Sequence, residues 1–142
     1  MTILSTAVLV IFLFWSDVDG GTNYEYAALS DVKNDSSVQA ASIPEFVPPS
    51  AREIVGWYHV ETNRQTLEFT FASQDKNLLE REFKQAKEGE AKEIAEKLGK
   101  YRWKGNFPSR QEAVVLSRSG AEGREYLVIN SNSLHAFYLS EP

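Results

Sequence analysis

Two short runs of the chain, residues 56–61 and 66–71, alternate between two kinds of side chain with a period of two. This spacing predicts β-strands, because successive side chains of a strand point to opposite faces of a sheet. Asn63-Arg64 interrupts the alternation, so we expect an antiparallel hairpin with a two-residue turn. Arg64 suits the positive φ of such a turn poorly, and a slip by one residue would exchange the two faces. The neighbours expected across the hairpin are Val60 and Leu67, Tyr58 and Phe69, and Gly56 and Phe71 on the buried face, and His59 and Glu68, and Trp57 and Thr70 on the other face.

The segments that follow complete an α+β pattern. Asp75 suits the N-cap of a helical region with one apolar stripe, and Gly89 could divide that region into two helices. Three strands are expected over residues 112–117, 124–130 and 134–139. This order favours a mainly antiparallel sheet of about five strands with one or two helices on one face, preceded by an N-terminal hydrophobic helix. The apolar stripe consists of Leu79, Phe83, Ala86, Ile94 and Leu98.

The run Ile3–Trp15 contains only Ser5 and Thr6 as polar side chains. As a helix it would be about 20 Å long, which is shorter than the roughly 30 Å hydrocarbon core of a bilayer. We expect a short membrane anchor that adapts by tilting; the alternatives are a signal or signal-anchor segment, cleaved or retained, and a buried core element. The expected organisation is a membrane helix over residues 1–16, a tether over 17–42 that is partly structured from about residue 24, and one α+β domain over 43–142.

Charge and composition narrow the functional classes. No Lys or Arg precedes Lys33, whereas Asp17 and Asp19 follow the apolar run. Positive residues retain a flank in the cytoplasm, so we expect the domain to lie on the outer side of the membrane. The formal net charge of -5 over 142 residues disfavours nucleic-acid binding, which relies on a positive field. The absence of cysteine excludes disulfides, thiol nucleophiles and cysteine-based zinc sites.

Glu68 and the two histidines are the candidates for acid–base chemistry. A carboxylate beside the imidazole of His59 would raise the pKa of that histidine. Without a third catalytic group, the pair is more readily explained as a surface contact, and His135 as a partly buried, hydrogen-bonded side chain of the last strand. We therefore predict no catalytic residue, no metal site and no cofactor.

Basic and aromatic residues alternate over residues 100–107, which include Arg102 and Trp103. On a strand, the rings would share one face and the cations the other. Such a surface can stack bases, hold a glycan or lie at a lipid headgroup layer. The simpler interpretation is a strand with its rings in the core and its charges in water.

Four short sequence elements between residues 24 and 71 form a longer motif, which is more specific than amino-acid composition. The element IPEFVPPSAREI over residues 43–54 is preceded by YEYA over 24–27 and followed by ETN over 61–63 and FTF over 69–71. Together they resemble small bacterial envelope proteins with a YbbD-type head domain, although Val47 and Glu61 depart from the Leu and Asp usual in that family. The resemblance covers roughly residues 24–139 and implies an envelope location, with no assigned activity. It also implies that residues 43–54 pack across the sheet.

The favoured function is that of a non-enzymatic, membrane-anchored domain on the outer side of a bacterial cytoplasmic membrane, which binds a protein or an envelope component. Its partners would be the membrane, through residues 3–15, and a protein, with no nucleic acid. One alternative is an immunity protein against an envelope-acting toxin, since acidic surfaces speed association with basic partners. Another is a small hydrolase that uses His59 or His135. The candidate binding residues are Trp57, His59, Glu68, Arg102 and Trp103.

Overall fold

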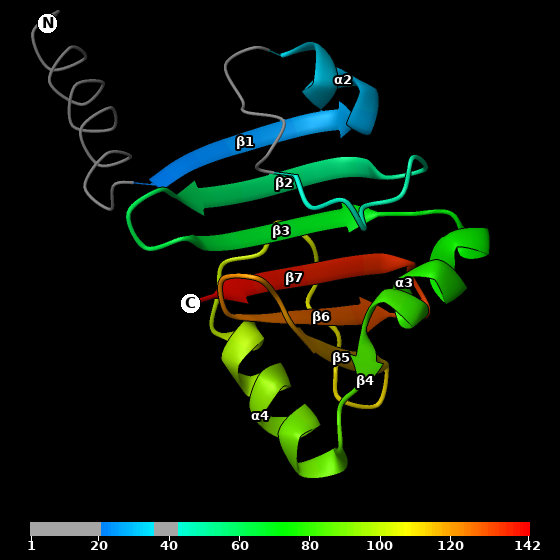
Figure 1. Cartoon of the computed structure of the whole chain (residues 1–142). Coiled ribbons are helices and arrows are strands. Elements are labelled where there is room, and N and C mark those ends of the chain that lie inside the picture. The colour runs from blue at the N-terminus through cyan, green and yellow to red at the C-terminus, as the bar shows by residue number, and fades with distance from the viewer. Residues whose placement is uncertain (1–20, 36–42) are drawn as a thin grey trace, which may run out of the picture.

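The computed structural model describes residues 21–35 and 43–142, and the predicted membrane helix over residues 1–16 lies outside them. The described chain forms one seven-stranded sheet in the order β1-β2-β3-β7-β6-β5-β4, with every neighbouring pair antiparallel (Figure 1). The mainly antiparallel α+β fold is therefore confirmed, with seven strands in place of about five. None of the described helices is long and apolar enough to cross a bilayer. The elements are β1 (Gly21–Ala28), α2 (Leu29–Asn34), β2 (Arg52–His59), β3 (Arg64–Thr70), η2 (Ser73–Asp75), α3 (Lys76–Glu82), β4 (Lys84–Gln85), α4 (Glu88–Gly99), β5 (Ala113–Ser119), β6 (Arg124–Asn130) and β7 (His135–Glu141).

Strand β1 forms from residues expected to belong to the tether. Tyr24 of β1 lies opposite Gly56 of β2, and its phenol ring covers the glycine, where an added Cβ would lie 2.1 Å from the ring carbon Cζ. The missing side chain of Gly56 thus makes room for the ring, which is buried. This contact joins residues 32 positions apart in sequence, so the local pattern of β1 alone does not reveal it.

The predicted register of the first hairpin is wrong by four positions. His59 lies opposite Arg64 and Tyr58 opposite Gln65, so residues 60–63 form a four-residue loop. Asn63 is the one residue of this loop with a positive φ, of 51°, and Arg64 does not adopt that conformation. Because the shift is even, each side chain keeps its predicted face. Val60 is the exception: it lies in the loop and is 69% exposed.

The predicted helical region is interrupted before Gly89. Residue Phe83 ends α3 in an extended conformation and turns its ring into the core, edge-on to Phe46. The next two residues pair with β5 as the short strand β4. Asp75 does occupy the N-cap position of α3, but its carboxylate accepts a hydrogen bond from the Ser50 hydroxyl and none from the helix backbone.

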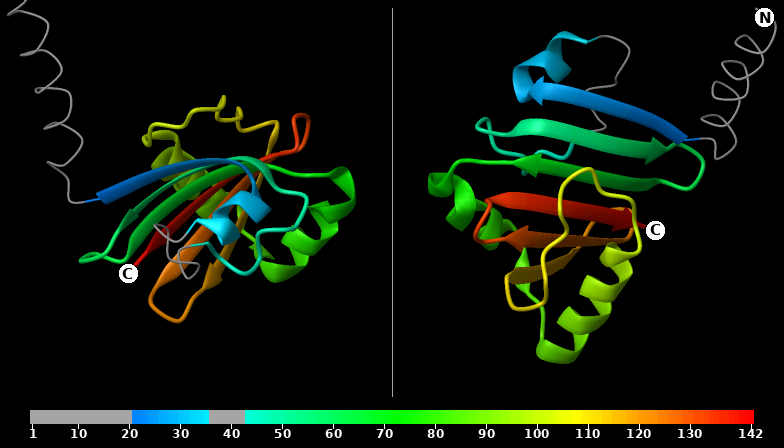
Figure 2. Two further views of the ribbon diagram at one scale, coloured as in Figure 1. Left: turned by 90° about the horizontal axis from the view of Figure 1, so that it is seen from above. Right: turned by 180° about the vertical axis from the view of Figure 1, so that it is seen from behind.

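The two longer helices cover opposite faces of the sheet, so the expectation of helices on one face is wrong. Leu79 of α3 belongs to the core on one face, which we call face B, together with Leu67, Phe69 and Tyr138. Leu98 of α4 belongs to the core on the other face, face A. Seen from above, α3 and the segment after α4 lie on opposite sides of the sheet (Figure 2). The segment 43–51 packs on face B through Phe46 and Val47, as the motif predicts, whereas residues 52–54, expected to pack there too, form the beginning of β2.

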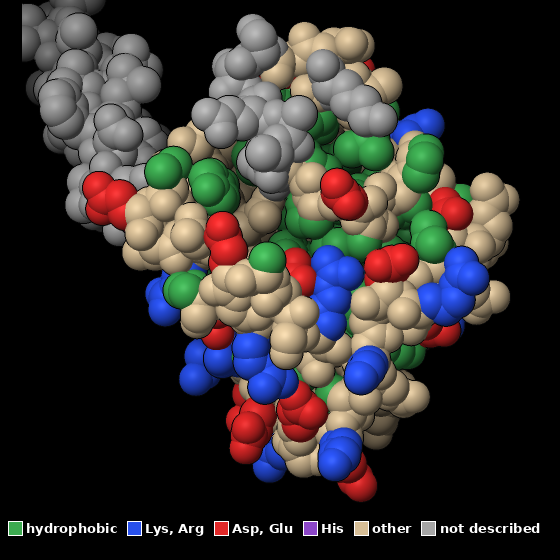
Figure 3. Space-filling model, in the orientation of Figure 1, with side chains coloured by type: hydrophobic (Ala, Val, Ile, Leu, Met, Phe, Trp, Pro, Cys, Tyr) green, Lys and Arg blue, Asp and Glu red, His purple; other side chains and the backbone are tan. Residues whose placement is uncertain are grey.

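Face A is covered unevenly. Helix α4 contacts β5 and β7. Over β2, the face A side chains of Val55, Trp57 and His59 are only half-buried. On face B, hydrophobic side chains gather over the upper middle of the view, and acidic and basic side chains are interspersed below them (Figure 3). The part of face A formed by β1, β2 and the beginning of β3, away from the buried Glu68, is called the open half-face below.

Candidate functional site

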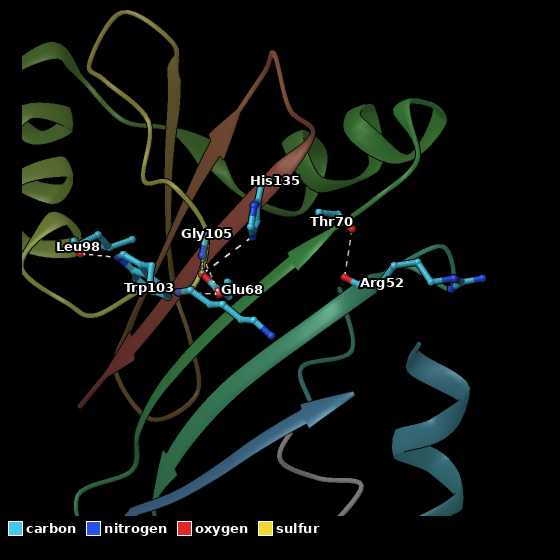
Figure 4. A network of polar contacts seen from close by, with 8 residues as sticks. Arg52, Glu68, Thr70, Leu98, Trp103, Gly105 and His135 are labelled. Carbon is cyan, nitrogen blue, oxygen red and sulfur yellow. Dashed lines mark hydrogen bonds and ion pairs between the residues drawn. The ribbon is translucent and has the colours of Figure 1, made fainter. Parts of the chain in front are cut away.

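Glu68 is the most deeply buried charged side chain of the described chain, with 2% exposure. It lies on face A of β3, between Val55 of β2 and Phe137 of β7. Its Oε1 atom accepts hydrogen bonds from the backbone N–H groups of Lys104, at 2.9 Å, and Gly105, at 3.2 Å. The carboxylate therefore ties residues 101–107, called the strap, to the middle of the sheet (Figure 4).

The strap has an irregular backbone and is not the strand that its alternation predicts. Its rings nonetheless turn inward: the indole of Trp103 packs edge-on against Phe137 at 5.2 Å and stacks on Phe107 at 6.2 Å between ring centroids. The indole N–H also donates to the carbonyl of Leu98, at 2.8 Å, which satisfies a carbonyl group at the end of α4. Arg102 is exposed. The predicted separation of rings and cations is present, without the predicted strand.

His135 lies beside Glu68 beneath the strap. Its Nε2 atom is 3.9 Å from Glu68 Oε2, is buried and makes no hydrogen bond. Burial lowers the pKa of this imidazole. The negative charges of Glu68 and, to a smaller extent, Glu53 raise this pKa and so oppose part of the decrease. A Cβ added to Gly105 would lie 2.2 Å from His135 Cε1, so strap and ring are closely packed. The arrangement holds the strap in place and leaves no room for a substrate between these groups.

His59 lies elsewhere, and the predicted pair between His59 and Glu68 is wrong. Its Nδ1 accepts the backbone N–H of Thr62 at 3.2 Å, which closes the hairpin loop. Its ring lies 5.8 Å from that of Trp57. Gly21 packs directly against the indole, where a Cβ would lie 2.0 Å from Trp57 Nε1. Trp57 and His59 therefore form an aromatic pair on the open half-face, apart from the buried Glu68.

A polar pocket of about 380 Å³ opens on face B, between the β2–β3 loop and the turn that joins β5 to β6. This volume lies within the range of small-molecule sites. Tyr138 donates a hydrogen bond to Glu125 at 2.5 Å, and Arg118 Nε donates to the same carboxylate at 2.6 Å. Burial, followed by the contact with Glu125, raises the pKa of Tyr138, so the phenol stays protonated. Sequence reasoning missed this pocket because its lining comes from five separate segments.

Comparison with known proteins gives no match: no protein-family model, no curated protein and no solved structure is similar to the chain. The resemblance to proteins with a YbbD-type head domain therefore stays a prediction. Among the described residues, no group of three or more His, Asp and Glu side chains is placed to hold a metal ion.

Proposed function

We propose that the chain is a non-enzymatic binding domain, anchored by residues 3–15 and held on the outer side of a bacterial cytoplasmic membrane, where the open half-face binds a protein. The observation that carries the proposal is the pair formed by Trp57 and His59, whose side chains are only half-buried on that half-face. Trp is among the residues that most often dominate the binding energy of protein interfaces.

The histidines support a binding role better than a hydrolytic one. The Nδ1 atom of His59 is used by the hairpin loop, and His135 is enclosed by Glu68 and Gly105. A general base needs to reach the proton of a bound substrate, directly or through one water. Neither imidazole lines the polar pocket of face B.

The strap adds a polar rim to the open half-face. Lys104 forms an ion pair with Glu25 of β1, and so links the strap to the edge of the sheet across this half-face. Arg64 and Arg102 are exposed. A half-buried aromatic centre with a charged margin matches the usual arrangement of non-obligate protein interfaces.

The anchor supports a location at the membrane surface. Only residues 16–20 separate Trp15 from Gly21, which begins β1 directly opposite His59. Trp57 and His59 therefore lie at the end of the open half-face where β1 begins, and only five residues separate the beginning of β1 from the anchor. A partner bound there would itself be a membrane or envelope protein.

Site-specific photo-crosslinking of the full chain in bacterial cells tests the proposal. A benzophenone amino acid at Thr66, which lies opposite Trp57 on the same face, is expected to give a discrete product with one protein. The same probe at Glu93, exposed on α4, is the matched control and is expected to give none. The variant Trp57→Ala should abolish the product, whereas Val60→Ala, at the exposed loop, should retain it.

Three results would contradict the proposal. An equally strong product from the probe at Glu93 would show that the crosslinking is not specific to the open half-face. Unfolding of Trp57→Ala would place this side chain in the core. Recovery of the full chain in the soluble cytoplasmic fraction would remove the membrane location.

A further inference from the structure

We infer that the polar pocket on face B binds a neutral saccharide. The pocket lies on the opposite face of the sheet from Trp57, so this inference goes beyond the proposed function and is tested separately from it. Its lining includes Tyr58 from β2, Asn63 from the hairpin loop, Glu125 from β6, and Tyr138 and Ser140 from β7.

The charges of the pocket disfavour an anionic ligand. Glu122 and Glu125 both line it, and none of the described residues of the lining is Lys or Arg. Arg118 donates to Glu125 through Nε at 2.6 Å and through a terminal nitrogen at 3.4 Å, and its other terminal nitrogen lies 3.6 Å from Glu82, so its charge is already shared by two carboxylates. A phosphate or carboxylate in the pocket would meet uncompensated negative charge and no cation to bind it. Nucleotides, phosphosugars and organic acids are therefore poor fits.

The hydrogen-bonding groups suit hydroxyls. A sugar hydroxyl donates and accepts at once, and it is best matched by a wall that mixes acceptors with hydroxyl and amide groups. The Glu125 carboxylate offers two oxygens with room for about four hydrogen bonds, of which Tyr138 and Arg118 use part. The hydroxyl of Ser140 and the amide of Asn63 lie on the same lining.

The hydrogen-bonded Tyr138 keeps one side of the pocket rigid. Its hydroxyl donates to Glu125 at 2.5 Å. Because its raised pKa keeps the phenol protonated, Tyr138 stays the donor of this hydrogen bond over the physiological pH range. A preorganised polar wall lowers the cost of ordering side chains when a ligand binds.

The ring of Tyr58 supplies the apolar contact that a sugar also needs. It is half-buried, and it lines the same pocket as the polar groups. A pyranose carries hydroxyls around its rim and C–H groups on its faces, so it can place one face against an aromatic ring while its rim bonds to polar groups. The pocket volume of about 380 Å³ suits about one or two sugar rings.

Saturation-transfer NMR on the full chain in detergent micelles tests the inference with defined probes. Glucose, methyl β-galactoside and N-acetylglucosamine are the neutral probes, glucose 6-phosphate is the anionic probe and glucosamine the cationic one. At least one neutral sugar is expected to bind with a Kd on the order of 1 mM, and glucose 6-phosphate is expected to bind about tenfold more weakly than glucose.

Three variants locate the binding. Asn63→Gly removes the amide and still permits the φ of 51°, Ser140→Ala removes one hydroxyl, and Tyr58→Ala removes the ring. Each of the first two should weaken binding several-fold, and the third by about tenfold or more. Glu93→Ala, on the exposed surface of α4, is the control that should leave sugar binding unchanged. The outcome of the crosslinking experiment has no bearing on the sugar result, because the two sites lie on opposite faces of the sheet.

The inference is overturned if no neutral sugar binds to the folded chain at about 20 mM. It is also overturned if binding survives both Asn63→Gly and Ser140→Ala, which are the least disruptive changes to the lining. Tighter binding of glucosamine than of any neutral sugar would instead identify a cation site built on the two carboxylates. Each variant is first checked for cooperative unfolding, so that loss of binding is not confused with loss of the fold.

Discussion

Replacing Glu68 with Ala removes the carboxylate that holds the strap against the middle of the sheet. Two backbone donors, the N–H groups of Lys104 and Gly105, lose their acceptor. Hydrogen bonds to a charged group contribute about 1.5–3 kcal/mol each, and release from burial of a carboxylate with 2% exposure offsets part of their sum. We expect Glu68→Ala to lower the free energy of unfolding by about 2–4 kcal/mol. Glu68→Gln keeps one acceptor oxygen without the charge, and is expected to cost about half as much.

Urea unfolding followed by tryptophan fluorescence measures the global effect, and amide hydrogen exchange measures the local one. The amides of residues 104 and 105 should exchange much faster in Glu68→Ala. The amides of β6, an interior strand paired with β5 and β7, should keep their protection relative to the global stability. Glu80→Ala is the control, because Glu80 forms a helix-surface ion pair with Lys76, at 3.9 Å, of the kind that contributes little to stability. A loss below about 0.5 kcal/mol, with unchanged exchange at 104 and 105, would refute the assignment of Glu68 as the anchor of the strap.

Three further predictions concern His135 and two glycines; urea unfolding tests the first two, and limited proteolysis tests the third. The free energy of unfolding of the wild-type chain should decrease as pH falls below about 6.5, because the lowered pKa of His135 makes the folded state bind fewer protons than the unfolded chain. His135→Phe should reduce the slope of the free energy of unfolding against pH. An identical slope in this variant would contradict the role of the histidine. Gly105→Ala should cost about 1–3 kcal/mol because the new methyl group meets the imidazole, whereas Gly89→Ala, which meets nothing within 4 Å, should be neutral or stabilising; equal effects would disprove the close packing of the strap. Gly56→Ala should displace the ring of Tyr24 and expose β1 to proteolysis, and a chain as resistant as wild type would show that this contact does not hold β1.

The local sequence pattern predicted some features of the candidate site and not others. Glu68 and His135 were both recognisable in the sequence as titratable groups on strands, and the structure brings them together. Their proximity was not predictable, because it depends on β7 inserting between β3 and β6. The inward rings of the strap followed from their spacing with the cations. The irregular backbone of the strap did not, because the buried acceptor on β3 that holds it lies 36 residues away from Lys104.

The polar pocket carries no sequence signal of its own. Tyr58, Asn63 and Glu125 belong to different elements, and each is an ordinary residue of a strand or a loop. The four-residue loop brings Asn63 to the rim of the pocket, and the predicted two-residue turn would have placed it elsewhere. A site assembled from several segments exists only once the strand order and register are set.

The sequence by itself indicated five of the seven strands, all except β1 and β4, and the faces to which the side chains of the first hairpin point. The bounds of β6, Arg124–Asn130, match the expected ones, and the faces of β2 and β3 are as predicted, because the period of two is a property of the single extended chain. Tertiary structure decided three features that the sequence did not predict. These are the register of the first hairpin, the pairing of β1 with β2 where Tyr24 covers Gly56, and the position at which Phe83 turns into the core and divides the helical region. These depend on close contacts between residues distant in sequence, and a local pattern carries no information about which distant surface will fit it.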